Sequence, residues 1–106
     1  MFTAAKDALT SSTARKFING KIERYGEVQN LQIDSKRKTV TIVCDLIGET
    51  EPIEVTIGKY VIEDSGGTDY VRATGITASR PWISKLLEDF VEGRRFEVPG
   101  WAKAAL

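Results

Sequence analysis

Carboxylates that stand close together are the first candidates for chemistry in this chain of 106 residues. They occur as Glu63 with Asp64, Glu49 with Glu51, and Glu88 with Asp89. Two carboxylates can divide the roles of general acid and general base when their surroundings separate their pKa values. The first two pairs fall in predicted turns and the third on the polar side of a predicted helix. We therefore interpret all three as solvated surface charges.

The absence of histidine excludes more reactions than any residue present suggests. Without His, neither a Ser-His-Asp nor a Cys-His arrangement can activate a nucleophile, and imidazole metal ligands are missing. Cys44 is the only cysteine, which excludes an internal disulfide and a multi-cysteine metal site. Its alternation with Val40, Ile42 and Leu46 places an unreactive thiol in the core. We predict that the protein is not an enzyme and has no catalytic residues, metal or cofactor.

Phosphate and nucleic-acid sites are not indicated either. The Ser65–Thr68 stretch, Ser-Gly-Gly-Thr, lacks the lysine of a P-loop and does not lead into a predicted helix, so we interpret it as a hairpin loop. Three short basic clusters are spread along a chain with 15 basic and 15 acidic residues, and nothing in the sequence brings them together. We expect no nucleic-acid partner. No apolar run is long enough for a signal peptide or a transmembrane segment, and we expect a cytoplasmic protein.

The elements that must position any site begin with the best-marked helix, over residues 79–93. Ser79 can cap its free amides, Pro81 suits the first turn, and Gly93 suits the left-handed position that ends a helix. Its apolar stripe recurs at helical spacing and is predicted to be buried against a sheet; it consists of Ile83, Leu86, Leu87, Phe90 and Val91.

The N-terminal region carries two apolar stripes that are out of phase. The change of phase falls at residues 10–13, Thr-Ser-Ser-Thr, which is typical of helix capping. We therefore expect a short N-terminal helix and then a firmer helix from about residue 12 to Tyr25, ended by Gly26. The alternative is a turn at Asn19-Gly20 with a strand that begins near Lys21. We favour the helix, because the period of the second stripe continues through Gly20.

Four alternating segments between the helices predict strands, at residues 27–33, 39–46, 53–62 and 70–78. A change of parity across Gly58 predicts a β-bulge near Gly58-Lys59 that curls the sheet. The fold class is α+β: an N-terminal helix, a four-stranded antiparallel meander and a C-terminal amphipathic helix, with both helices on one face of a curled sheet. We expect one domain over residues 1–106, with peripheral arms at 1–12 and 94–106. The second arm should fold back over the core.

Two binding hypotheses from different classes follow from exposed apolar positions. Val43, Ile47 and Val61 should face away from the helices, and such patches often mark contact with a protein partner or a second copy. This favours a small non-enzymatic binding or assembly module. The alternative is a carrier of a small apolar ligand or lipid in a cleft between sheet and helices.

The residues proposed for that cleft are Trp82, Tyr60 and Tyr25, which lie near the predicted curl of the sheet. Trp82 also has a second interpretation, in which it packs under the tail that contains Phe96 and Trp101. An enzyme that uses Tyr, Asp or Lys ranks third.

Overall fold

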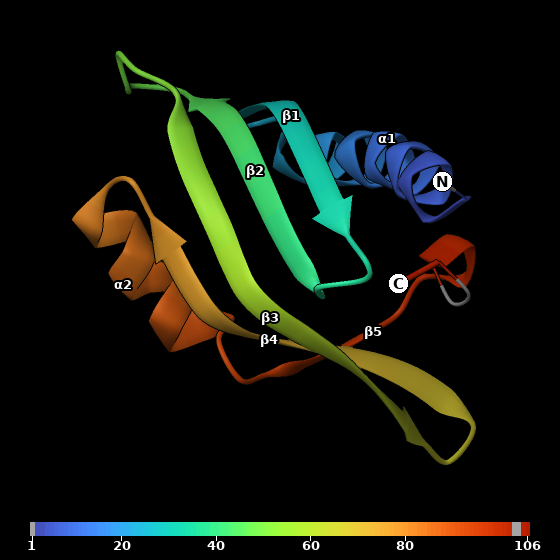
Figure 1. The fold of residues 1–106 in the computed structure, drawn as a ribbon. Coiled ribbons are helices and arrows are strands. Elements are labelled where there is room, and N and C mark those ends of the chain that lie inside the picture. Colours follow the sequence, from blue (N-terminus) through green and yellow to red (C-terminus); the bar gives the residue numbers. More distant parts are fainter. Residues whose placement is uncertain (1, 103–104) are drawn as a thin grey trace.

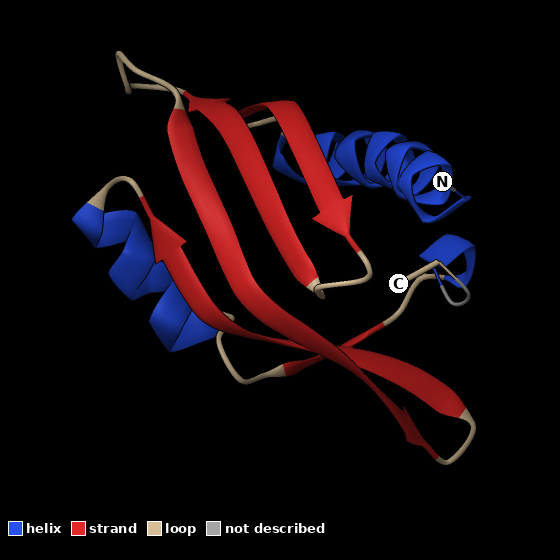
Figure 2. Cartoon of the chain, viewed as in Figure 1, coloured by secondary structure: helices blue, strands red, loops and turns tan. Residues whose placement is uncertain are grey.

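A computed structural model describes residues 2–102 and 105–106, and the side chains of all of these except residues 2–4 and 101. Its elements follow in the order α1 (Phe2–Ile22), β1 (Gly26–Asp34), β2 (Thr39–Leu46), β3 (Ile53–Ser65), β4 (Thr68–Ala78), α2 (Pro81–Phe90), β5 (Arg95–Glu97) and the 3-10 helix η1 (Gly100–Ala102). The predicted class, α+β with an antiparallel sheet, is confirmed. Figure 2 shows α1 beside β1 and α2 beside β4, toward opposite edges of the sheet.

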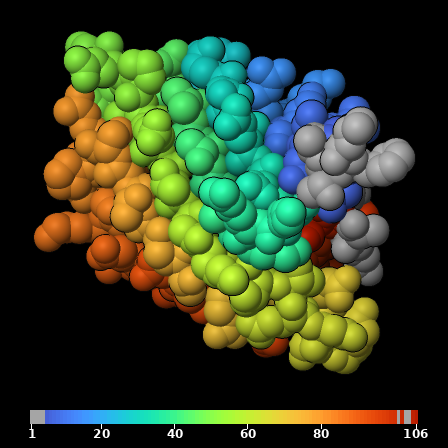
Figure 3. Space-filling view, in the orientation of Figure 1, coloured from blue at the N-terminus to red at the C-terminus, as the bar shows by residue number. Residues whose placement is uncertain are grey.

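The sheet is an antiparallel meander in the order β1-β2-β3-β4-β5. It has five strands, so the prediction of four is wrong: Arg95–Glu97 pairs with Tyr70–Arg72 along the edge of β4. In the space-filling view the sequence colours run across the surface in chain order, as a meander requires (Figure 3).

The β3–β4 hairpin carries the curl of the sheet, and Figure 1 shows it bending away beyond the ends of β1 and β2. Its pairing stays in register on both sides of Gly58, so no residue is inserted between these two strands. On the other side of β3, however, the Tyr60 N–H donates to the Lys38 carbonyl at 2.9 Å. Continuing the β2–β3 register would place Lys38 opposite Lys59, so this bond is offset by one residue. The β3–β4 pairing therefore shows no bulge at Gly58-Lys59, and a register shift lies instead in the β1–β2 pair, between Val28 and Asn30.

Two glycines make this bend feasible. Gly58 lies opposite Gly75, and a Cβ atom on Gly58 would come within 3.1 Å of the Gly75 carbonyl oxygen. Gly75 also has a φ of +65°, a conformation that side chains rarely adopt. Beyond this pair, the buried position on β3 changes to Tyr60. The face of the hairpin that is directed at the core thus changes across this glycine pair, although no residue is inserted between β3 and β4.

Helix α1 is continuous, so the predicted break at residues 10–13 is wrong. Thr10 and Ser11 are buried and do not cap a second helix. The favoured path through Gly20 is confirmed, and the helix ends at Ile22, three residues before the predicted end.

Helix α2 differs from its prediction at its first residue and in its burial. Its N-cap is Arg80, which makes no side-chain cap, whereas the Ser79 hydroxyl accepts the Glu54 N–H at 3.0 Å. Of the predicted stripe, only Ile83 is buried, while Leu86 is 46% and Phe90 63% exposed. The reason is that α2 contacts the sheet mainly along β4, near one edge, which buries only one side of the helix.

The core is one cluster of buried side chains to which both helices contribute. Its buried members are Ala14, Val28, Leu31, Ile33, Cys44, Ile53, Tyr60 and Ile83. Cys44 is buried, as predicted. Burial raises the pKa of its thiol, and the charge of Asp45 adds to this effect. Among the described residues, no helix has the length and apolar character needed to cross a membrane.

Candidate functional site

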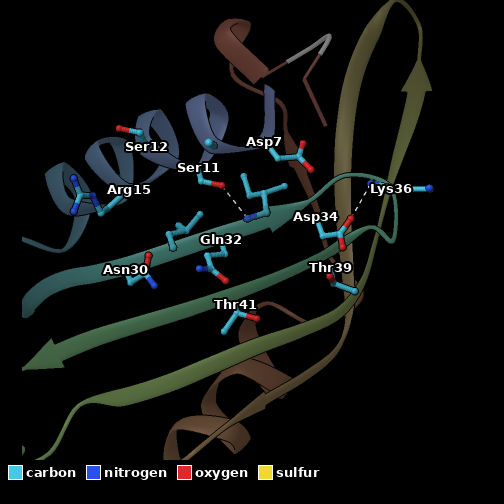
Figure 4. Close-up of a pocket in the computed structure, with 13 residues that line it drawn as sticks. Asp7, Ser11, Ser12, Arg15, Asn30, Gln32, Asp34, Lys36, Thr39 and Thr41 are labelled. Carbon is cyan, nitrogen blue, oxygen red and sulfur yellow. Dashed lines mark hydrogen bonds between the residues drawn. The ribbon is translucent and has the colours of Figure 1, made fainter. Parts of the chain in front are cut away.

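A polar groove of about 860 Å³ lies between α1 and β1 (Figure 4). Its walls come from the middle of α1, from β1 and from the start of β2. The residues in Figure 4 are mostly hydroxyl, amide and charged side chains, which include Ser12, Arg15, Asn30, Gln32 and Thr41. The sequence did not indicate this groove.

A line of polar side chains on α1 accounts for much of the groove. Asp7, Ser11, Arg15 and Asn19 recur at intervals of four residues, which places them along one side of the helix. The Ser35 N–H and hydroxyl donate to the Asp7 carboxylate at 3.0 and 2.7 Å. The Ile33 N–H donates to the Ser11 hydroxyl oxygen at 2.9 Å.

The same line continues toward the C-terminal end of α1. The Arg15 guanidinium donates to the Gln29 carbonyl at 3.5 Å, and the Asn19 amide both donates to the Val28 carbonyl and accepts its N–H. Each of these groups on β1 points away from β2. The polar line therefore occupies the free edge of the sheet, and its spacing of four residues was the signal in the sequence that could have revealed it.

Asp7 is the buried charge of this edge. Burial opposes ionisation of its carboxyl, but the two hydrogen bonds from Ser35 and the positive charges of Lys6 and Lys38 outweigh it. The pKa of Asp7 is therefore lower than its ordinary value. Both carboxylate oxygens already hold partners, so this group stabilises the β1 edge and is not poised as a base. No cluster of three or more potential metal ligands occurs among the described residues.

The second hollow, of about 490 Å³, lies at the other end of the sheet and is more apolar. Its lining combines the α1–β1 loop, the end of β2 and the start of α2, with Arg24, Tyr25, Leu46, Ile47, Gly48, Glu49 and Trp82. The Ile47 N–H donates to the Tyr25 carbonyl at 2.8 Å, which fixes these two segments side by side. Tyr25 is 64%, Ile47 77% and Trp82 57% exposed.

This hollow brings together residues from both binding hypotheses. Tyr25 and Trp82 were proposed for a ligand cleft, and Ile47 for a partner face. Trp82 lies beside Ile47 here, while the Trp101 side chain, under which it was alternatively expected to pack, lies outside the described residues.

The remaining predicted site residues lie elsewhere. Tyr60 is buried in the core, where Lys38 Nζ lies 5.5 Å from its ring centroid, and its hydroxyl has no partner among the described residues. Burial, with the charges of Asp7 and Asp34, raises the pKa of Tyr60 to about 12. Val43 is half-buried between Asn30 and Glu54, and Val61 lies further along the β3–β4 hairpin opposite Arg72.

Helix α2 extends the second hollow into a larger surface. Trp82, Leu86 and Phe90 recur at intervals of four residues and are all exposed. Together with Tyr25 and Ile47 they form what we call the aromatic patch. Leu86 and Phe90 belong to the stripe that was predicted to be buried. The sequence therefore identified them as apolar but did not show that they are exposed.

No family model, curated protein or solved structure matches this chain. The function must therefore be argued from the two hollows and the surfaces beside them.

Proposed function

We propose that this chain is a small non-enzymatic binding or assembly module that makes protein–protein contacts through the aromatic patch. The observation that carries the proposal is the exposed line Trp82, Leu86 and Phe90 on a helix whose adjacent side is already packed on the sheet. Exposed aromatic side chains grouped in this way are typical of interfaces, where they supply large contact areas.

The state of the sheet edges favours the aromatic patch as the contact surface and disfavours contact by strand pairing. Strand addition needs free N–H and C=O groups along an edge. On β1 the Val28 N–H and carbonyl, the Gln29 carbonyl and the Ile33 N–H are bonded to the polar line of α1. On β4 the Ile76 N–H donates to the Glu92 carboxylate and the Ala73 carbonyl accepts the Gly93 N–H, both at 2.9 Å. β5 pairs with residues 70–72 of that edge.

A carrier of a small apolar ligand is the second candidate, favoured by the hollow between Tyr25 and Trp82. Pockets for small molecules enclose most of the ligand surface. Here Tyr25, Ile47 and Trp82 are each more than half exposed, and Tyr60 does not contribute. The geometry is therefore better suited to a broad contact than to an enclosed ligand.

The test compares the full chain with a patch variant in extracts of its own expression host. We expect the wild-type chain to elute in an assembly, and the double substitution Trp82→Ser and Phe90→Ser to release it as a monomer. Leu9→Ser is the matched control, because Leu9 is 74% exposed on α1 and lies outside the patch. Elution of all three as bare monomers contradicts the proposal.

Native mass spectrometry of the same samples distinguishes the second candidate. A monomer that carries additional small-molecule mass, lost in the Trp82→Ser variant, would favour the ligand carrier instead.

A further inference from the structure

The exposed line on α2 lies between two lines of side chains with different surroundings. Ile83 and Leu87 face the sheet, where Ile83 is buried and Leu87 packs against the core. Lys85 and Asp89 are exposed on the other flank, and their side chains make no hydrogen bond or ion pair with any residue that the structure describes. Around the circumference of α2, the apolar line therefore lies between the side that faces the core and the charged flank.

This order is self-complementary when two α2 helices meet in antiparallel orientation. A twofold axis beside Leu86 brings Leu86 of both copies together and sets Trp82 of each copy against Phe90 of the other. The same axis keeps the two charged flanks on one side of the contact. Lys85 of each copy then approaches Asp89 of the other. A parallel pairing would set the charged flank of one helix against the apolar Ile83–Leu87 side of the other, without partners for either charge.

Overall charge and contact size add two further constraints. The net charge is zero, so no general repulsion opposes the approach of two copies. A helix of ten residues presents too little surface alone, because stable interfaces bury at least about 1,200 Å² in total. The contact must therefore include Tyr25 and Ile47 beside Trp82, and we expect a dissociation constant that is roughly micromolar.

We propose that the occupant of the aromatic patch is a second copy of this chain, docked through antiparallel α2 helices in a twofold-symmetric dimer. This inference rests on the proposed function, since it names the partner of the same surface.

The first test is sedimentation equilibrium of the full chain over a concentration series that spans the micromolar range. The wild-type protein should pass from monomer to dimer. Leu86→Glu places two carboxylates on the twofold axis and should abolish the dimer, whereas the control Leu9→Glu should retain it. Circular dichroism checks that both variants are folded.

The second test uses the charged flank and reports on the orientation of the helices. Lys85→Glu and Asp89→Lys each bring like charges together at two places, so each variant alone should dimerise about tenfold more weakly. An equimolar mixture of the two variants should form a heterodimer of about wild-type affinity, because opposite charges then meet at both places. The double variant, with both substitutions in one chain, should also dimerise with about wild-type affinity.

Each remaining outcome overturns the inference in a distinguishable way. A wild-type chain that is monomeric throughout the series contradicts the dimer; if the patch variant still releases it from an assembly in host extract, the proposed function stands with a different partner. If neither effect is seen, both proposals fail. A dimer that survives Leu86→Glu, or charge variants that do not recover on mixing, would place the contact elsewhere on the chain.

Discussion

Helices α1 and α2 lie along β1 and β4, toward opposite edges of the sheet, but the lines of side chains that they carry differ in kind. At β1, α1 directs a line of polar residues at the backbone and bonds its free groups. At β4, the bonds to the edge come from Glu92 and Gly93, which follow α2, and the helix keeps an apolar line exposed. The polar side chains of α1 are satisfied within the molecule, whereas the apolar side chains of α2 remain available to a partner.

The largest loss of stability is expected on substitution of Asp7, which belongs to the polar line of α1. Asp7→Ala leaves the buried N–H and hydroxyl of Ser35 without an acceptor, which should lower the free energy of unfolding by about 3 kcal/mol. Urea denaturation measures the change. Glu88→Ala, which removes an exposed carboxylate on α2 outside the proposed contact, is the control and should stay within about 0.5 kcal/mol of wild type. Equal effects of the two substitutions would mean that the β1 edge does not depend on α1.

A smaller effect is expected one turn further along α1. Ser11→Ala removes the acceptor of the Ile33 N–H and should cost about 1–2 kcal/mol in the free energy of unfolding. Ser12→Ala is a closely matched control, because Ser12 is exposed and both substitutions gain the same helix propensity. The difference between the two variants isolates the hydrogen bond, and a difference near zero would contradict its role.

Acid should weaken the β1 edge through the same carboxylate. The pKa of Asp7 in the folded protein lies below its ordinary value, so the unfolded chain binds more protons as the pH falls. The stability that Asp7 contributes is therefore complete above the unfolded pKa, near 4, and is lost as the pH falls through the folded pKa. Urea midpoints measured from about pH 6 to pH 2 should fall more steeply for wild type than for Asp7→Asn. Parallel curves would show that Asp7 does not carry this dependence.

The smallest effect on stability is expected on α2. Leu86→Ala, measured at concentrations where the chain is monomeric, should change the free energy of unfolding by less than about 1 kcal/mol, because this side chain is already half exposed. Leu9→Ala on α1 should behave similarly. A loss of several kcal/mol for Leu86→Ala would show that the apolar line stabilises the fold and is not a free surface.

Regular periodicity made most of the sheet predictable. Alternating β-branched residues indicated β2, β3 and β4, and Pro81 indicated the first turn of α2. The strand β5 was missed because Arg95–Glu97 offers only Phe96 between two charged residues, too short a pattern to separate from a loop. The break in α1 was predicted because Thr10 and Ser11 are usual capping residues.

The candidate site could be predicted only as separate residues. Tyr25, Ile47 and Trp82 stand far apart in the sequence, and the bond between the Ile47 amide and the Tyr25 carbonyl that joins two of these segments depends on the register of β1 with β2. Amphipathic spacing identified Leu86 and Phe90 as apolar, but it carries no information on how closely a helix approaches the edge of its sheet. The polar line of α1 was not predicted for a related reason, since a helix that covers a strand edge needs polar side chains where a core helix has apolar ones.

The polar line of α1 also constrains the order in which the chain can assemble. Asp7 meets Ser35 and Ser11 meets Ile33, so α1 gains these partners only after a strand made later in synthesis has formed. The side chains of α1 that pack against the core, Ala14, Ile18 and Ile22, lie in the second half of the helix, so its first half depends on these bonds. During folding β1 is consequently an open edge for a time, and the docking of α1 is the step that removes the most exposed template for aggregation from the molecule.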